Sequence, residues 1–186
     1  MREDILKVAS QQFAQYGFKK TTLTDIASSL GKQKTALYYY FKNKESIFSE
    51  IISIEAESLV NQLGQILLED SDEVTKLQNY LNARIKIMSE IAERYKVLKD
   101  ELFFLLPDIE KARTPYHTME CEALSSLLES GRTKGVFSLN NPKQMATTIV
   151  NILKGLEIPM YIREDMGQDE EEVYGFVSLI VKGLTK

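Results

Sequence analysis

Hydrophobic positions recur every three or four residues along almost the whole chain, which is the spacing of one face of an α-helix. In the first half, these repeats predict helices over about residues 2–16, 22–30, 34–41, 44–68 and 72–95. In the second half, they predict a helix over 96–106 ended by Pro107, another ending near Gly131, and two strongly apolar helices over 142–163 and 169–184. No stretch alternates as a strand would. The pattern therefore predicts an all-α fold.

The stretch from Thr22 to Lys44 predicts two short helices joined by a tight turn. Thr22 and Asp25 have the spacing of a capping box at the start of the first helix. Gly31 suits its end, because glycine accepts the left-handed backbone conformation found there. A short helix–turn–helix of this kind is a common DNA-reading unit.

The second of these helices has one apolar face and one polar face. Leu37 and Phe41 point inward, while Thr35, Ala36 and Tyr39 point outward between Tyr38 and Tyr40. Three consecutive tyrosines cannot all face one core, because successive residues are rotated by about 100°. This argues against an ordinary helical hairpin with packed tyrosines. We predict that DNA is contacted by Thr22, Thr24, Lys34, Thr35, Ala36, Tyr38, Tyr39, Tyr40 and Lys44, with bases read by Thr35, Ala36 and Tyr39.

The charge distribution agrees with this assignment although the net charge of the chain is −4. Residues 1–48 carry eight Lys or Arg against four Asp or Glu, a net of +4. The remaining residues carry 15 against 23, a net of −8. The basic N-terminal part can therefore meet phosphate, from which the acidic remainder would be repelled.

The N-terminal motif resembles the TetR family of bacterial transcriptional regulators. The residues that carry the resemblance are Gly17, Thr22, Ile26-Ala27, Leu30-Gly31, Leu37-Tyr38, Tyr40-Phe41 and Lys44-Glu45. Lys32 and Gln33 stand where the family often has Val-Ser, and Thr35 stands where it often has glycine. The resemblance implies a helix–turn–helix DNA-binding domain, placed here at residues 1–46, and a helical effector-binding and dimerisation domain at 47–186.

Aromatic and methionine residues with a few polar ends gather between residues 80 and 119, a composition typical of small-molecule pockets. The resemblance also implies an effector pocket in this region. Its predicted lining is Tyr80, Arg84, Met88, Phe103, Phe104, Tyr116, His117 and Met119. The alternatives are that these residues are simply core, and that Arg84 extends to solvent. The two apolar helices over 142–163 and 169–184 predict a homodimer through a four-helix contact.

These features together predict a repressor that binds a palindromic operator in double-stranded DNA as a homodimer and is released by an unidentified small-molecule effector. One alternative is a DNA-binding regulator without an effector. An enzyme is disfavoured, because the lone His117 has no evident nucleophile partner and no phosphate-binding loop is present. No cofactor, metal site or membrane span is expected, and the protein is expected to be cytoplasmic.

Overall fold

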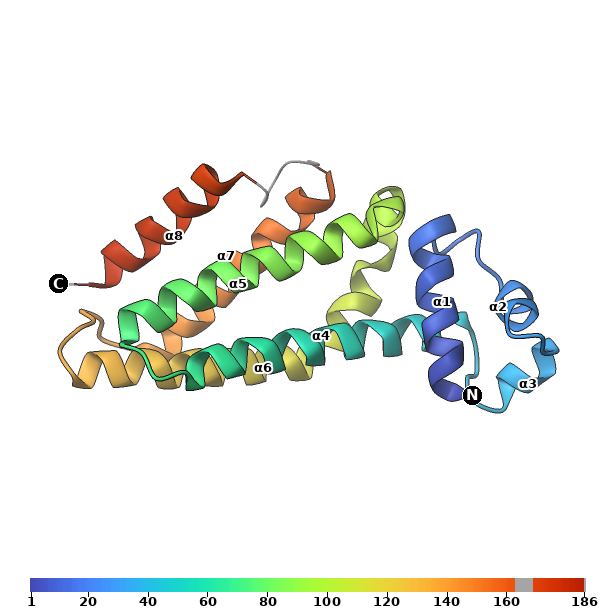
Figure 1. Cartoon of the computed structure of the whole chain (residues 1–186), viewed down its shortest axis with the longest axis horizontal. Coiled ribbons are helices and arrows are strands. Elements are labelled where there is room, and N and C mark those ends of the chain that lie inside the picture. The colour runs from blue at the N-terminus through green and yellow to red at the C-terminus, as the bar shows by residue number, and fades with distance from the viewer. Residues whose placement is uncertain (163–168, 186) are drawn as a thin grey trace. The chain divides into compact units, whose positions relative to one another are not determined.

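A computed structural model describes residues 1–162 and 169–185 (Figure 1). The all-α prediction is confirmed. The helices are α1 (Arg2–Tyr16), α2 (Leu23–Ser29), α3 (Lys34–Tyr38), α4 (Lys44–Leu68), α5 (Glu73–Arg94), the 3₁₀ helix η1 (Lys96–Glu101), α6 (Leu102–Thr133), α7 (Pro142–Ile162) and α8 (Glu170–Leu184). Residue 163, the last of one predicted helix, lies outside the described residues.

The predicted break at Pro107 is wrong, because α6 continues through Pro107 to Thr133. Proline removes one helical N–H, which here would have bonded to the carbonyl of Phe103. Both Phe103 and Pro107 are exposed, so water can reach the carbonyl that loses its partner. The helix therefore tolerates a proline in its second turn. A second proline, Pro115, lies further along the same helix.

The chain divides into two compact units. The first combines Met1–Ala56 with Arg94–Thr114, and the second combines Glu57–Glu93 with Pro115–Lys186. The predicted domain boundary after residue 46 stays a prediction, because packing units and functional domains need not end at the same residue.

The first unit is built on three aromatic rings from α1, the turn after it, and α4. The centroids of Phe13, Phe18 and Phe48 lie 5.1 to 5.7 Å from one another. Tilted and edge-to-face contacts at this distance are favourable for aromatic rings. Ile26 of α2 and Leu37 of α3 are fully buried in the same unit. This core fixes α2 and α3 through their inner faces and leaves their outer faces in solvent.

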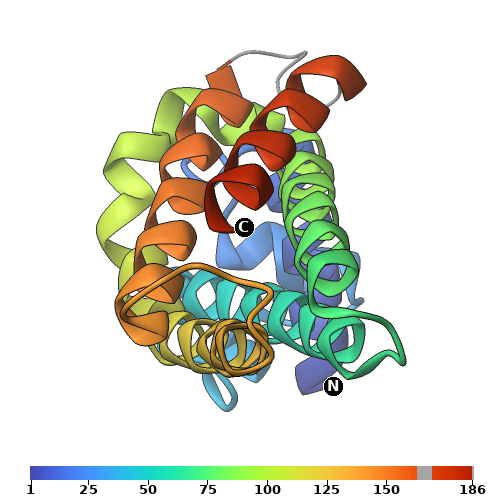
Figure 2. The ribbon, with the colours of Figure 1, turned by 90° about the vertical axis from the view of Figure 1, so that its left-hand side faces the viewer.

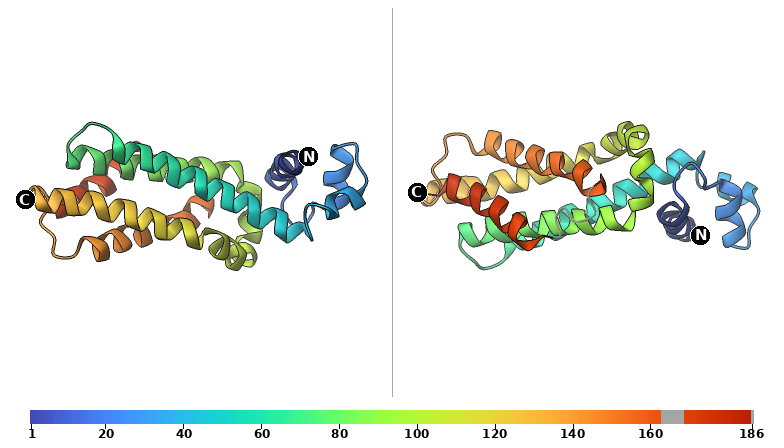
Figure 3. Two further views of the ribbon diagram at one scale, coloured as in Figure 1. Left: turned by 90° about the horizontal axis from the view of Figure 1, so that it is seen from below. Right: turned by 90° about the horizontal axis from the view of Figure 1, so that it is seen from above.

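The second unit has its own core (Figure 2). In the end-on view, α5, α7 and α8 surround an interior above the second half of α4 and the neighbouring part of α6. Figure 3 shows these parts of α4 and α6 running side by side. The core includes Leu81 and Leu128 and the α8 residues Val177 and Val181. Thus the inner face of α8 belongs to the core of its own protomer.

Candidate nucleic-acid interface

The first helix of the predicted DNA-reading unit begins and ends as its sequence predicts. The Thr22 hydroxyl accepts a hydrogen bond from the Asp25 N–H at 3.2 Å, and the Asp25 carboxylate accepts from the Thr22 N–H at 2.9 Å. These hydrogen bonds from Thr22 lower the pKa of the Asp25 carboxyl. At the other end, Gly31 has φ +64°, and the N–H groups of Gly31 and Lys32 bond to the carbonyls of Ser28 and Ala27. This is a Schellman motif, which directs the chain sharply toward α3.

Helix α3 is shorter than predicted, because it ends at Tyr38 instead of residue 41. Its N-cap residue, Gln33, makes no side-chain capping hydrogen bond. Beyond the helix, the Phe41 N–H still bonds to the Leu37 carbonyl at 2.9 Å. The helical direction therefore persists through the tyrosines, although the regular helix has ended.

The two faces of this segment differ as the sequence predicts. Leu37 is fully buried and Phe41 nearly so, whereas Tyr39 is 86% exposed. Tyr38 and Tyr40 are also exposed on either side. Thr22, Thr24, Lys34 and Thr35 are exposed, and Ala36 is half-buried. The segment thus presents hydroxyls and one small side chain outward, which suits a helix lying against base edges and phosphates.

The two predicted phosphate-binding lysines occupy different environments. Lys34 is exposed, and its ammonium lies 5.5 Å from the centre of the Tyr38 ring. Lys44 is half-buried, and its ammonium donates hydrogen bonds to the Phe18 carbonyl at 2.6 Å and the Thr21 carbonyl at 2.8 Å. Burial lowers the pKa of Lys44, against the opposing effect of the Glu45 and Glu101 carboxylates. Lys44 therefore has bonding partners inside the first unit, and its assignment to a phosphate stays a prediction.

Residues 5–51, which contain this whole arrangement, match the family model of the bacterial regulatory proteins of the tetR family. Residues 5–51 thus form a tetR-family domain. The match covers the capped α2, the exposed α3 and the first turns of α4.

Curated relatives include the HTH-type transcriptional repressor KstR2 of Mycolicibacterium smegmatis, 30% identical over 54% of this chain and 49% of that protein. Another is the biofilm operon icaADBC negative transcriptional regulator IcaR of Staphylococcus epidermidis, 28% identical over 64% of this chain and 62% of that protein. The chain thus spans about half to three-fifths of the length of these relatives. A solved transcriptional regulator from Cytophaga hutchinsonii superposes with a TM-score of 0.77 at 27% identity, covering 99% of this chain and 98% of that one.

In the second unit, two of the predicted ligand-binding residues form a buried polar network. Arg84 is only 1% exposed, and its guanidinium donates to Glu120 at 2.8 Å and to Glu157 at 2.6 Å. The Tyr80 hydroxyl donates to the same Glu120 oxygen at 2.9 Å. Burial alone would lower the pKa of Arg84, but the two carboxylates raise it above its ordinary value. Arg84 does not extend to solvent, and its partner carboxylates were not among the predicted residues.

The other predicted lining residues differ in burial. Met88 is buried in the second core, Tyr116 and His117 are half-buried, and Met119 is exposed. Phe103 and Phe104 are both exposed and belong to the first unit. The predicted lining residues are therefore divided between the two units and differ widely in exposure.

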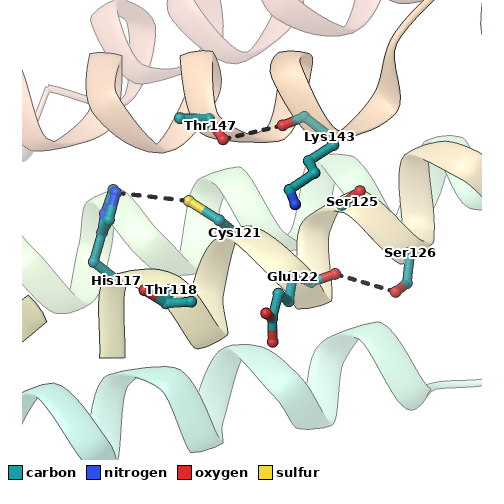
Figure 4. A pocket seen from close by; sticks show the side chains of 8 residues that line it. All are labelled: His117, Thr118, Cys121, Glu122, Ser125, Ser126, Lys143 and Thr147. Atoms are coloured by element: carbon teal, nitrogen blue, oxygen red, sulfur yellow. Dashed lines mark hydrogen bonds between the residues drawn. The ribbon is translucent and has the colours of Figure 1, made fainter. Parts of the chain in front are cut away.

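A pocket of about 420 Å³ lies between α6 and α7 of the second unit (Figure 4). His117 is the one predicted residue that lines it. The others are Thr118, Cys121, Glu122, Ser125, Ser126, Lys143 and Thr147, whose side chains each carry a polar atom. The His117 Nε2 lies 3.8 Å from the Cys121 Sγ, and burial raises the pKa of that thiol. The sequence did not predict this pocket, because the predicted lining was based on aromatic residues and methionines, which do not line it.

Proposed function

We propose that this chain is a sequence-specific DNA-binding transcriptional regulator that acts as a repressor. The observation that carries the proposal is the group of exposed tyrosines at the end of α3 and just after it. Tyr39 is 86% exposed while Leu37, two residues away, is fully buried, so the large outward side chains do not serve the protomer's own core. Aromatic and polar side chains held outward on a helix–turn–helix, in a basic segment, suit the DNA major groove. Repression is supported by two relatives, the transcriptional repressor KstR2 and the negative transcriptional regulator IcaR.

The proposed regulator binds a palindromic operator as a homodimer through α7 and α8. A two-fold dimer presents two reading helices to two half-sites, which gives enough base contacts for specificity. Large apolar side chains on these helices support this contact, because Ile152 of α7 and Tyr174 and Leu179 of α8 are exposed in the protomer. Exposed apolar side chains on these two helices are a surface that a second copy of the chain could bury.

The proposed effector site is the pocket between α6 and α7, whose lining side chains carry polar atoms. Its side chains suit a small polar molecule, since Lys143 can bind an anionic group and Glu122 a cationic one. The competing possibility is a regulator without an effector. The Arg84 network favours that alternative, because these side chains already satisfy one another in the interior where the effector was expected.

A selection from random double-stranded DNA tests the DNA-binding proposal. We expect the purified chain to enrich an inverted repeat, because a two-fold dimer reads the same sequence on both strands. Recovery of DNA with no common sequence, or no recovery at all, would contradict the proposal. Adding candidate polar metabolites to the bound complex then tests release, and by linkage the operator must weaken binding of any true effector by the same factor.

The dimer is tested with Leu179→Glu, which places a charge on an apolar side chain that is 73% exposed in the protomer. We expect dissociation to monomers by light scattering and a loss of operator affinity, because a buried unpaired charge opposes association. Leu68→Glu is the matched control, since Leu68 is 78% exposed but lies at the end of α4. Equal effects of the two variants would contradict an interface through α7 and α8.

A further inference from the structure

The turn between α1 and α2, residues 17–21, is held by side chains from two distant segments of the first unit. It begins at Gly17, whose φ of +87° favours glycine, and it ends just before the N-cap of α2. The direction of this turn sets the direction in which α2 leaves α1. The turn therefore also orients α3, because the Schellman motif fixes α3 to α2.

On one side, the Glu101 carboxylate accepts two backbone hydrogen bonds. The same oxygen, Oε2, accepts from the N–H groups of Phe18 and Lys19, each at 3.0 Å. Its other oxygen lies so close to Gly17 that a Cβ at that position would be 3.1 Å from it. Glu101 is the last residue of η1 and lies more than 80 residues from this turn in the sequence. The two N–H groups point at one anionic acceptor, which is the arrangement of a small anion-binding nest.

On the other side, Lys44 binds the carbonyl groups of the same turn. Its ammonium donates to the carbonyls of Phe18 and Thr21, and it lies 4.2 Å from the centre of the Phe18 ring. Phe18 therefore has its N–H bound by Glu101 and its C=O bound by Lys44. Four backbone polar groups of a five-residue turn are thus held by two oppositely charged side chains. Charge-assisted hydrogen bonds of this kind are about twice as strong as neutral ones.

We propose that Glu101 is a positioning residue for DNA recognition, which fixes the turn 17–21 and so the direction of α2 and α3. This inference rests on the proposed DNA-binding function. Glu101 holds backbone N–H groups and does not need to contact DNA to act. Its loss would loosen the angle of the reading helix while leaving every DNA-contacting side chain in place.

This role predicts a specific pattern of binding defects. Recognition of an operator needs base contacts at defined positions, so it depends on the angle of α3. Binding to random DNA depends on phosphate neutralisation and is tolerant of that angle. Loss of Glu101 should therefore weaken operator binding and leave random-DNA binding unchanged. A residue that merely stabilised the fold would lower both by the same factor, through a smaller folded fraction.

The experiment measures affinities of Glu101→Gln for the selected operator and for random DNA of the same length. We expect operator affinity to fall about tenfold, because one amide oxygen without charge replaces a carboxylate that accepts two bonds. Random-DNA affinity and the salt dependence of binding should match those of the unchanged chain. Asp100→Asn is the matched control, since it removes the same charge from the neighbouring, exposed residue of η1 and should change nothing.

Two additional measurements separate the possible outcomes. Amide hydrogen exchange at Phe18 and Lys19 should accelerate in Glu101→Gln, while Glu101→Asp, which keeps the charge on a shorter side chain, should have an intermediate operator affinity. Equal losses for operator and random DNA, or no loss with unchanged exchange, would overturn the role of Glu101. If the unchanged chain binds no DNA, the proposed function fails and this inference fails with it.

Discussion

The outer face of α3 and the interior of the second unit both contain polar side chains that the sequence predicts to be functional. The two groups differ in exposure and in bonding partners. At the end of α3 and just after it, Tyr38, Tyr39 and Tyr40 are exposed to solvent. In the second unit, Tyr80 and Arg84 are buried and bonded to carboxylates of α6 and α7. The first surface is available to a partner, whereas the second group already has its partners within the chain.

The comparison shows what makes a polar residue a good candidate for binding. Exposed polar groups on a fixed backbone can exchange water for a ligand at little cost. A buried arginine has already lost its water, so its carboxylate partners must remain or be replaced by an equally anionic group. The Arg84 network therefore stabilises one packing of α5, α6 and α7, and the exposed α3 face is the stronger candidate for recognition.

The largest expected effect comes from removing Arg84 from its buried network. Arg84→Ala leaves the Glu120 and Glu157 carboxylates buried without their common cation, so we expect a loss of about 3–5 kcal/mol in the free energy of unfolding. Chemical denaturation measures it. Arg132→Ala is the control, because Arg132 pairs with Glu129 at an exposed site and its removal should have no measurable effect. A small loss for Arg84→Ala would contradict this stabilising role, and recovery of stability by a small molecule would indicate a binding site here.

Sequence reasoning succeeded where local rules decide the structure. The capping box of Thr22 and Asp25 and the left-handed Gly31 are set by residues within a few positions of each other, and so are the bounds of α1 and α4. The outward direction of Tyr39 follows from helical rotation alone. In each case the relevant neighbours are close in sequence, so periodicity and capping preferences are enough.

Sequence reasoning failed where the partners are distant in sequence. Arg84 meets Glu120 and Glu157, which are 36 and 73 residues away, and nothing in the local pattern of α5 indicates them. Lys44 resembles a phosphate-binding residue because it follows the reading helix, yet its ammonium binds the turn that contains Phe18. An amphipathic pattern states which face of a helix is buried, and it does not state which side chains meet there.

A smaller effect, confined to specificity, is expected on the exposed side. Tyr39→Ala should change base preference at one operator position by about 1–3 kcal/mol, because a major-groove contact would be lost while the backbone of α3 stays in place. Repeating the DNA selection with this variant measures the change. Tyr16→Ala is the control, since Tyr16 is also exposed but lies at the end of α1. The same selected sequence in both variants would remove Tyr39 from the reading surface.

The smallest expected effect is on the salt dependence of DNA binding, and it distinguishes Lys34 from Lys44, which the sequence predicts to have the same role. Lys34 is exposed, so Lys34→Ala should remove about one phosphate contact per protomer and make the slope of log affinity against log salt shallower by about one unit. The loss should be the same for operator and random DNA, because phosphate contacts carry no sequence information.

Lys44→Ala should leave that salt slope unchanged, because its ammonium is bound to the carbonyls of Phe18 and Thr21. It should instead weaken operator binding more than random-DNA binding, since the turn before α2 loses its support. Affinities measured for both variants at several salt concentrations distinguish the two roles. A shallower slope for Lys44→Ala would show that Lys44 contacts a phosphate. Its ammonium would then exchange its carbonyl partners within the protomer for phosphate when DNA binds.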